Sequence, residues 1–259
     1  MTLIQARRGE ILSLAQQNGE VSASDLSKLL GVSEVTVRSD LNALSDSGQL
    51  RRTRGGARLP LDLERPLLLG ETSLEETSRR HSAAKRRIGR AAAGLVQNDE
   101  TVFLDVGSTT TEVARALSPT LRGVTIITNG LNIALELERL PNVRVIVTGG
   151  TLRPLQHSLV SPYALEVLGR IHADRLFLGC NGVSATAGVT NANHEEAEIK
   201  RVMVQQSREV VVVADHSKLG HISQAQVAHV GAVHTLITDK HSNGPPADLL
   251  NCIPDLRIV

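Results

Sequence analysis

One stretch decides the fold of the first part of the chain, residues 31–44, which read GVSEVTVRSDLNAL. The opening glycine suits a tight turn, and Ser33 is a good N-cap for a helix. Val37, Leu41 and Leu44 then follow at the i, i+4, i+7 spacing that places apolar side chains on one helical face. The stretch therefore predicts a turn followed by a short amphipathic helix.

The sequence on either side supplies the rest of a small module. Apolar residues recur at helical spacing over 3–17, and Ser22 opens a second helix with Asp25 three residues on, as in a capping box. After the third helix, residues 49–58 read QLRRTRGGAR, which predicts short strands around a turn. Residues 3–58 are therefore predicted to form a winged helix-turn-helix domain of the α+β class.

The third helix and the hairpin carry side chains suited to DNA. Arginine can bind guanine, asparagine can bind adenine, and serine and threonine can bind bases or phosphates. The hairpin arginines have no acidic residue among them and suit phosphate or minor-groove contacts. The candidate DNA-binding residues are Ser33, Thr36, Arg38, Ser39, Asn42, Arg51, Arg52 and Arg54. A three-helix domain that binds protein, with its arginines in solvent, is the alternative interpretation.

Composition limits the other function classes. The 259 residues hold only two Phe, one Tyr and no Trp, which disfavours single-strand binding on aromatic platforms. The net charge is +1, and residues 1–60 hold eight basic and six acidic residues, half of the basic ones on the hairpin. Two cysteines and no CxxC motif disfavour a disulfide scaffold or a structural zinc site. With no signal peptide or long apolar run, we expect a soluble, cytoplasmic protein.

The remainder of the chain alternates between short β-branched runs and helical patterns. Residues 59–80 are interpreted as a connector, and residues 81–259 as an α/β domain with a mainly parallel sheet. The predicted strands are 101–106, 124–128, 143–148, 175–179, 210–214, 234–238 and 256–259. The predicted helices are 85–95, 109–117, 130–140, 163–169 and 194–207.

Small and polar turns follow several of the predicted strands. Residues 105–111, DVGSTTT, place a Gly/Ser/Thr-rich loop between a strand and a helix, which suits phosphate although the loop could be only an N-cap. Further turns of this kind are 128–130, 148–151 and 215–218. Ligands collect at the carboxyl edge of parallel sheets, and Lys218 could pair with a phosphate there, or be a solvated loop lysine.

The N-terminal module resembles the DeoR family of bacterial transcriptional regulators. The resemblance lies in residues 32–42, VSEVTVRSDLN, and in residues 52–57, RTRGGA. Two positions depart from the usual family pattern. Ser39 stands where a second arginine is usual, and Arg54 stands where histidine usually precedes Gly-Gly-Ala.

Residues from about 85 to 239 resemble the sensor domain of the same family. The matching pieces include FLDVGSTT at 103–110, ITN at 127–129, TGG at 148–150 and ADHSK at 214–218. The resemblance implies a fold similar to ribose-5-phosphate isomerase and a phosphorylated sugar or related metabolite as effector. It implies these effector-binding residues: Asp105, Gly107, Ser108, Thr109, Thr110, Thr128, Asn129, Gly149, Gly150, Asp174 and Lys218.

The predicted function is a sequence-specific DNA-binding regulator, a repressor of a carbohydrate operon, controlled by such an effector. We expect a homo-oligomer, dimer or tetramer, because one winged module has a small DNA footprint. We expect no catalytic residues, cofactor, metal or membrane partner. Two alternatives stay open: a sugar-phosphate isomerase with an accessory N-terminal domain, and a protein-binding adaptor without DNA.

Overall fold

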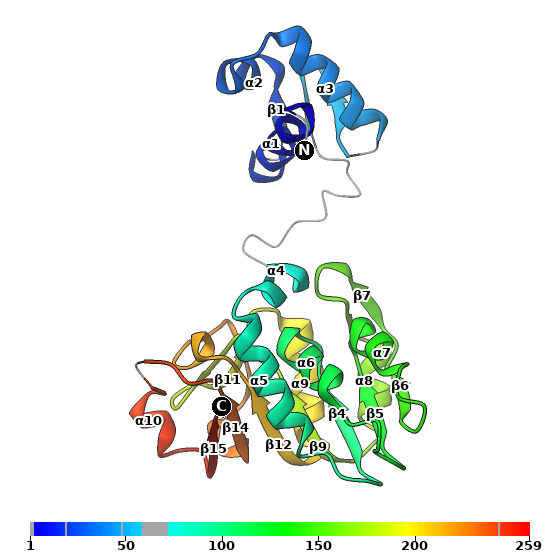
Figure 1. Ribbon diagram of the computed structural model, residues 1–259, viewed down its shortest axis with the longest axis vertical. Coiled ribbons are helices and arrows are strands. Elements are labelled where there is room, and N and C mark those ends of the chain that lie inside the picture. The colour runs from blue at the N-terminus through cyan, green and yellow to red at the C-terminus, as the bar shows by residue number, and fades with distance from the viewer. Residues whose placement is uncertain (1–2, 19, 48, 59–71, 243) are drawn as a thin grey trace. The chain divides into compact units, whose positions relative to one another are not determined.

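The computed structural model (Figure 1) describes residues 3–18, 20–47, 49–58, 72–242 and 244–259. The chain divides into two compact units, with the boundary between residues 71 and 72. Each unit has its own apolar core and is described by itself. The described part of the first unit is called the N-terminal module below.

Three helices form the body of the N-terminal module. They are α1 (Leu3–Asn18), α2 (Ala23–Leu30) and α3 (Glu34–Asp46). The predicted caps are confirmed: the Ser22 side chain accepts a hydrogen bond from the Asp25 amide, and Ser33 accepts one from Thr36. Gly31 lies in the left-handed region at the C-cap of α2, where a residue without Cβ turns the chain at little cost.

The wing has one strand more than the sequence predicts. Strands β2 (Arg51–Thr53) and β3 (Gly56–Arg58) form the predicted hairpin, and β1 (Glu20–Ser22) pairs with β3 from the other side. Three residues are too few to show an alternating apolar pattern, and therefore the sequence did not predict β1. Its pairing with β3 fastens the wing to the helices.

A buried carboxylate connects the first and third helices. Asp40 of α3 accepts hydrogen bonds from Arg7 Nε at 2.6 Å and from Arg8 Nε at 2.8 Å, both on α1. Burial opposes the ionisation of Asp40, but the two arginines outweigh it and hold the pKa of this carboxyl below its ordinary value. The ion pairs therefore fix the position of α3 against α1.

The second unit is built on a seven-stranded sheet whose neighbours are all parallel, in the order β15-β14-β12-β9-β4-β5-β6. The strands are β4 (Thr101–Leu104), β5 (Thr125–Thr128), β6 (Arg144–Val147), β9 (Ala173–Leu178), β12 (Ser207–Val213), β14 (Thr235–Thr238) and β15 (Asp255–Ile258). All seven were predicted, and the α/β class with a parallel sheet is confirmed.

Helices cover both faces of this sheet. On one face α5 (Ser82–Ala93), α6 (Ser108–Ala116) and α7 (Leu131–Leu137) pack against side chains such as Val102 and Leu104. On the other, α8 (Tyr163–Leu168) and α9 (His194–Gln205) pack against side chains such as Phe103. The alternation of successive strand residues between two apolar layers explains why the strands are almost uninterrupted apolar runs.

Shorter elements lie around the sheet and were not predicted. A hairpin is formed by β7 (Thr151–Arg153) and β8 (Ser158–Val160), joined by the 3-10 helix η1 (Pro154–Gln156). A three-stranded sheet contains β10 (Gly182–Ser184), β11 (Gly188–Asn191) and β13 (Ala225–Ala228). The remaining short helices are η2 (His216–Lys218), η3 (Val230–Ala232) and α10 (Ala247–Leu250).

The predicted connector, residues 59–80, needs a correction. Residues 59–71 lie outside the described part of the chain. Residues 72–80 belong to the second unit and contain α4 (Leu74–Arg79), which Ser73 caps. The sequence did not predict this short helix, because the stretch is rich in acidic and basic residues; its apolar residue, Leu74, is buried. None of the helices in the described ranges is long and apolar enough to span a bilayer.

The Asp40 ion pairs generate a stability prediction. Replacing Asp40 with Asn removes the charge that both arginines bind, and we expect a loss of about 2 kcal/mol, the scale of a charged hydrogen bond. Because the folded-state pKa of Asp40 is lowered, this contribution is present above about pH 4 and disappears as the pH falls through the folded pKa. Amide hydrogen exchange of α3 at pH 7 should be about thirtyfold faster in the variant, with the second unit as internal control. Equal exchange rates in the two proteins would contradict this role.

Candidate DNA-binding and effector sites

The outward face of α3 carries most of the predicted base-reading side chains. Arg38, Ser39 and Asn42 are exposed. Arg38 Nη2 lies 3.1 Å from Glu34 Oε2, but both side chains are about half exposed, so this pair is weak and can be exchanged for a DNA contact. Val35, 77% exposed on the same helix, was not predicted and is suited to a thymine methyl group.

Two of the predicted DNA-binding hydroxyls form hydrogen bonds at the N-terminus of α3. Ser33 Oγ accepts a hydrogen bond from the Thr36 amide at 3.2 Å and lies 2.9 Å from Thr36 Oγ1. Ser33 is exposed and Thr36 is half-buried. These side chains therefore orient the start of α3, and the exposed residues further along carry most of the candidate base contacts.

The wing presents its basic residues to solvent. Arg51, Arg52 and Arg54 are exposed, and Thr53 between them donates a hydrogen bond to Glu20 of β1 at 2.7 Å. Gly55, with a φ of 98°, forms the turn. The structure thus places three arginine side chains on a short, fixed hairpin, which suits contacts with phosphates.

The topology of the large sheet gathers the other candidates at one edge. The chain runs outward from β4 to β5 and β6, then returns to place β9 on the other side of β4 and continues through β12. The switch in direction therefore falls between β4 and β9. Ligands of open α/β sheets bind in the crevice beyond the carboxyl ends of the strands at such a point.

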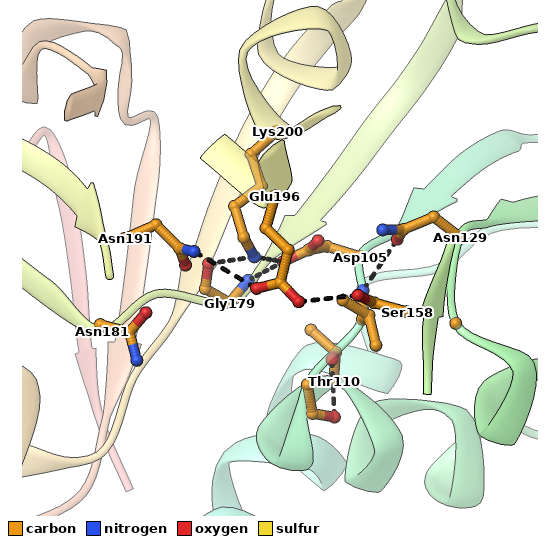
Figure 2. Close-up of polar contacts among 12 residues, drawn as sticks. Asp105, Thr110, Asn129, Ser158, Gly179, Asn181, Asn191, Glu196 and Lys200 are labelled. Atoms are coloured by element: carbon orange, nitrogen blue, oxygen red, sulfur yellow. Dashed lines mark hydrogen bonds and ion pairs between the residues drawn. The ribbon is translucent and has the colours of Figure 1, made fainter. Parts of the chain in front are cut away.

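A buried ion pair occupies this switch point (Figure 2). Asp105, the residue after β4, is fully buried and pairs with Lys200 Nζ of α9. The Gly179 amide, just after β9, donates to Asp105 Oδ2 at 3.0 Å, and Lys200 Nζ donates to the Gly179 carbonyl at 3.1 Å. Burial raises the pKa of Asp105 to about 6, although the Lys200 charge acts in the opposite direction. Among the described residues, Asp105 Oδ1 has no hydrogen-bond partner, which leaves one acceptor in the site.

The loop after Asp105 leads directly into α6. Gly107 precedes the helix, and its carbonyl accepts hydrogen bonds from the Thr110 hydroxyl at 2.9 Å and the Thr111 hydroxyl at 2.6 Å. These two hydroxyls shape the loop. Ser108 and Thr109 lie in the first turn, where backbone amides precede the first intrahelical bond. Their amides and hydroxyls are the better candidates for an anion.

Thr128 and Asn129 hold neighbouring loops together. Asn129 Oδ1 accepts from the Val106 amide at 3.1 Å, and Asn129 Nδ2 donates to the Leu159 carbonyl at 3.3 Å. The Thr128 hydroxyl accepts from the Gly130 amide at 3.0 Å. Both residues lie at the carboxyl edge, as predicted; Asn129 positions the loop after β4 against strand β8, and Thr128 shapes its own turn.

A second buried carboxylate lies beside the ion pair. Glu196, one turn before Lys200 on α9, accepts hydrogen bonds from Ser158 Oγ at 2.7 Å, from Arg153 Nη1 and from Asn191 Nδ2 at 3.3 Å. Figure 2 shows its carboxylate between Ser158 and Asn191, close to the Lys200 ammonium. The β7–β8 hairpin, strand β11 and helix α9 are therefore joined at one charged centre.

The remaining predicted effector residues at this edge lie on two other loops. Gly149 and Gly150 follow β6, and a Cβ on Gly150 would lie 2.0 Å from the Val160 carbonyl oxygen, so that position requires glycine for the approach of β8. Lys218 lies in η2 after β12 and is half-buried. The turn that contains it follows the carboxyl end of β12 and is capped by Asp215.

Asp174 does not join the other candidates, and its assignment to the pocket is wrong. It is the second residue of β9 and accepts a hydrogen bond from the Thr101 amide, the first residue of β4, at 2.9 Å. The starts of parallel strands lie at the edge of the sheet opposite to their carboxyl ends. Its neighbour Arg175 pairs with Glu100 and Glu209, so Asp174 serves the amino edge of the sheet.

The structure adds site residues that sequence reasoning missed. Sequence reasoning proposed no role in the effector site for Lys200, Arg153 or Ser158, and it left the contribution of residues 189–196, which include Asn191 and Glu196, unresolved. One signal was available: Glu196 and Lys200 are four residues apart on a helix face that also carries the apolar Ala197, Ile199 and Met203. Charges on an apolar face indicate a buried pair with distant partners.

Other parts of the described chain offer less to a ligand. A cavity of about 420 Å³ lies at the amino ends of β5 and β6, lined by residues 123–125 and 141–144, far along the strands from the ion pair. Arg144 is its charged lining residue. Across the described residues, no group of three or more His, Cys, Asp or Glu side chains could hold a metal ion.

A basic winged module joined to an α/β domain with a polar carboxyl edge defines the class: a DNA-binding transcriptional regulator with a ligand-sensing domain. Residues 7–61 match the DeoR-like helix-turn-helix domain, and residues 80–240 match the DeoR C terminal sensor domain. The chain belongs to the DeoR family of transcriptional regulators, as the sequence predicts.

Similar proteins support the same conclusion along nearly the full length of the chain. The chain is 35% identical to the HTH-type transcriptional regulator GolR of Listeria innocua, over 92% of this chain and 91% of that protein. It is 30% identical to the glycerol-3-phosphate regulon repressor of Escherichia coli, over 97% and 96%. Among solved structures, ribose 5-phosphate isomerase A of Methanocaldococcus jannaschii matches at 18% identity over 53% of this chain and 54% of that one, with a TM-score of 0.40.

The Asp105–Lys200 pair predicts a stability loss that depends on pH. Lys200→Met would leave the Asp105 carboxylate buried without its cation, at a cost of about 3–5 kcal/mol near pH 8. Asp105 has a raised folded-state pKa, so its ionisation destabilises the fold as the pH rises through about 6. The deficit of the variant should therefore shrink at pH 5, where Asp105 is protonated and needs no cation.

Urea unfolding of the full chain at pH 5 and pH 8 measures this deficit, and Lys240→Met, at an exposed lysine, is the control. The same deficit at both pH values would mean that Lys200 contributes only packing.

Proposed function

We propose that this DeoR-family regulator represses a carbohydrate operon and is released from, or held on, its operator by a phosphorylated sugar or related metabolite. The observation that carries the effector site is the buried Asp105–Lys200 pair, with one unpartnered Asp105 oxygen, beside the start of α6. The name of the Escherichia coli relative, which includes a phosphorylated small molecule, supports this chemistry.

The proposed site divides the ligand between two kinds of contact. The amides and hydroxyls of Ser108 and Thr109, together with Lys218, would bind the phosphate, because a helix start and a lysine both favour an anion. Asp105 Oδ1 would accept a hydrogen bond from a sugar hydroxyl. Gly107 and Thr110 shape the cradle, and Thr128, Asn129, Gly149 and Gly150 hold the surrounding loops in place. A ligand changes DNA binding only if it binds two arrangements of the protein unequally.

The second candidate function is sugar-phosphate isomerisation, since Asp105, Glu196 and Lys200 are acid–base groups in one site. Glu196 accepts hydrogen bonds from three donors, and Asp105 is paired with Lys200. Both carboxylates therefore have a structural role, which a mobile general base would not have. The names of the relatives favour regulation. Turnover of pentose or hexose phosphates by the purified chain, abolished by Lys218→Ala, would establish the enzyme instead.

We also propose that the protein acts in the cytoplasm as a homo-oligomer that binds double-stranded DNA at repeated half-sites. One winged module covers too little DNA for specific affinity on its own. The exposed side chains of α3 and the wing arginines would then be presented twice or more to one operator.

The DNA part of the proposal is tested with Arg38→Ala. If Arg38 reads a base, the variant should lose about 1–3 kcal/mol on a duplex selected from a random library and much less on an unselected duplex. Arg52→Ala, on the wing, should weaken both complexes alike, because a phosphate contact carries no sequence information. Fluorescence anisotropy over a range of salt concentrations measures both affinities.

The matched control for these variants is Arg86→Ala, which removes one exposed positive charge from the second unit. Equal losses for Arg38→Ala on the two duplexes would assign Arg38 to the phosphate backbone. No salt-dependent duplex binding by the unaltered chain would favour the adaptor.

The effector part is tested by thermal shift with a panel of phosphorylated sugars. A ligand at 100 times its dissociation constant should stabilise the protein by about 2.7 kcal/mol. Thr109→Ala and Lys218→Ala should each weaken ligand binding about tenfold or more, the scale of a lost charged hydrogen bond, and leave operator binding intact. Lys240→Ala is the control. Unchanged ligand response in both site variants would refute the assigned pocket.

A further inference from the structure

Helix α4 is the first described element after residues 59–71, which join the second unit to the N-terminal module. It is only six residues long, and Ser73 caps it by accepting a hydrogen bond from the Glu76 amide at 3.2 Å. So short a helix is not stable by itself. Its position therefore depends on the elements that hold it.

The first contact that fixes α4 is made by a buried lysine. Lys85 of α5 is 2% exposed, and its ammonium donates a hydrogen bond to the carbonyl of Thr77 in α4. On its other side Lys85 Nζ lies 4.0 Å from Asp215 Oδ2, in the loop after β12. One charged group thus connects α4 with the loop that carries Lys218.

A ring contact reinforces this connection. His81, at the corner between α4 and α5, lies edge-on to the ring of His216 at a centroid distance of 4.7 Å. His216 in turn lies 2.8 Å from Asp239 through Nδ1 and stacks on His241. The η2 turn, which contains both His216 and Lys218, is therefore in contact with the α4–α5 corner.

The second set of contacts that fixes α4 comes from the β7–β8 hairpin. Gln156 Nε2 donates to the Thr72 carbonyl at 2.5 Å, and His157 Nε2 lies 3.3 Å from Glu75 Oε1. Both residues belong to the turn of the β7–β8 hairpin, which supplies Arg153 and Ser158 to the Glu196 centre. Figure 1 shows α4 next to this hairpin, and α4 also packs on α6.

The charges around Lys85 determine how firmly it can hold α4. Burial lowers the pKa of Lys85, Asp215 opposes this effect, and the positive charges of Lys218 and Arg80 lower the pKa further, against a smaller effect of Glu112. Lys218 lies in the short η2 turn that Asp215 caps, and a second positive charge near a buried ammonium weakens the bond between that ammonium and its acceptor. An anion that neutralises Lys218 would remove part of that repulsion.

We propose that Lys85 is the positioning residue that couples the effector site to α4: neutralisation of Lys218 by a bound anion strengthens the Lys85–Thr77 contact and tightens α4 on the second unit. The inference rests on the proposed function, because it takes the Lys218 loop as part of the effector site. It adds the output element, α4, from which the chain continues toward the DNA-binding module.

The experiment is a ligand-free double-mutant cycle read by amide hydrogen exchange of α4 in the full chain. Lys218→Gln removes the charge that an anion would neutralise, and it should slow exchange of the α4 amides severalfold. Lys85→Met should accelerate it about tenfold, the scale of one lost charged hydrogen bond. The double variant should behave like Lys85→Met alone, because the effect of Lys218 passes through Lys85.

Lys240→Gln, which removes an exposed positive charge from the same unit, is the control and should leave α4 unchanged. Asp215→Asn keeps Lys85 and removes the carboxylate opposite it, and it should also loosen α4. The inference is overturned if Lys218→Gln leaves α4 exchange unchanged, or if it slows exchange equally in the presence of Lys85→Met. A purely structural lysine would loosen α4 without abolishing the effect of Lys218.

Inorganic phosphate separates this inference from the proposed function. With the unaltered chain, phosphate should raise the melting temperature and slow α4 exchange, and Lys85→Met should remove only the second effect. Stabilisation by phosphate without any change at α4 overturns the inference. If phosphate changes neither quantity, the phosphate site of the proposed function fails, and the ligand-free cycle still decides the role of Lys85.

Discussion

The buried Asp105–Lys200 pair is the constraint on which the effector domain depends. Removing two charges from water is costly, and the cost is offset only when both groups are paired and hydrogen-bonded. Here the Gly179 amide donates to Asp105 Oδ2 and the Gly179 carbonyl accepts from Lys200, while Asp105 Oδ1 has no partner among the described residues. The end of β4, the end of β9 and the middle of α9 must therefore meet at one place. That place is the switch point of the sheet, where the ligand of an open α/β fold binds.

Sequence patterns predicted the parts of this arrangement that are local. Runs of β-branched residues predicted the seven strands. The polar turns after these strands could then be placed at one edge of the sheet, because all the strands are parallel. The partners of the buried carboxylates could not be found in this way. Lys200 lies 95 residues after Asp105, and Ser158 lies 38 residues before Glu196. Only the packing of α9 and the β7–β8 hairpin brings them together.

The errors have equally physical causes. Asp174 was grouped with the pocket through its family resemblance, but it stands at the start of a strand and not at its end. The strand β1 and the helix α4 are shorter than the periods that a pattern needs, so they were missed or assigned to a connector. In the N-terminal module the net charge was equally uninformative. Asp40 pairs with Arg7 and Arg8 where α1 meets α3, whereas the wing arginines are exposed.

A regulator needs a site whose occupancy changes the position of something else, and the second unit has the elements for this. Helix α4 is too short to hold its own place, and it is held by the β7–β8 hairpin on one side and by Lys85 on the other. Lys85 contacts Asp215 in the loop that carries the candidate effector residue Lys218, and the hairpin supplies Arg153 and Ser158 to the Glu196 centre. A ligand that altered either loop would therefore have to alter the support of α4, because in a packed structure these loops cannot shift without their neighbours. Coupling between ligand and DNA then requires no contact between the two sites, only a short helix whose support depends on Lys85 and the β7–β8 hairpin.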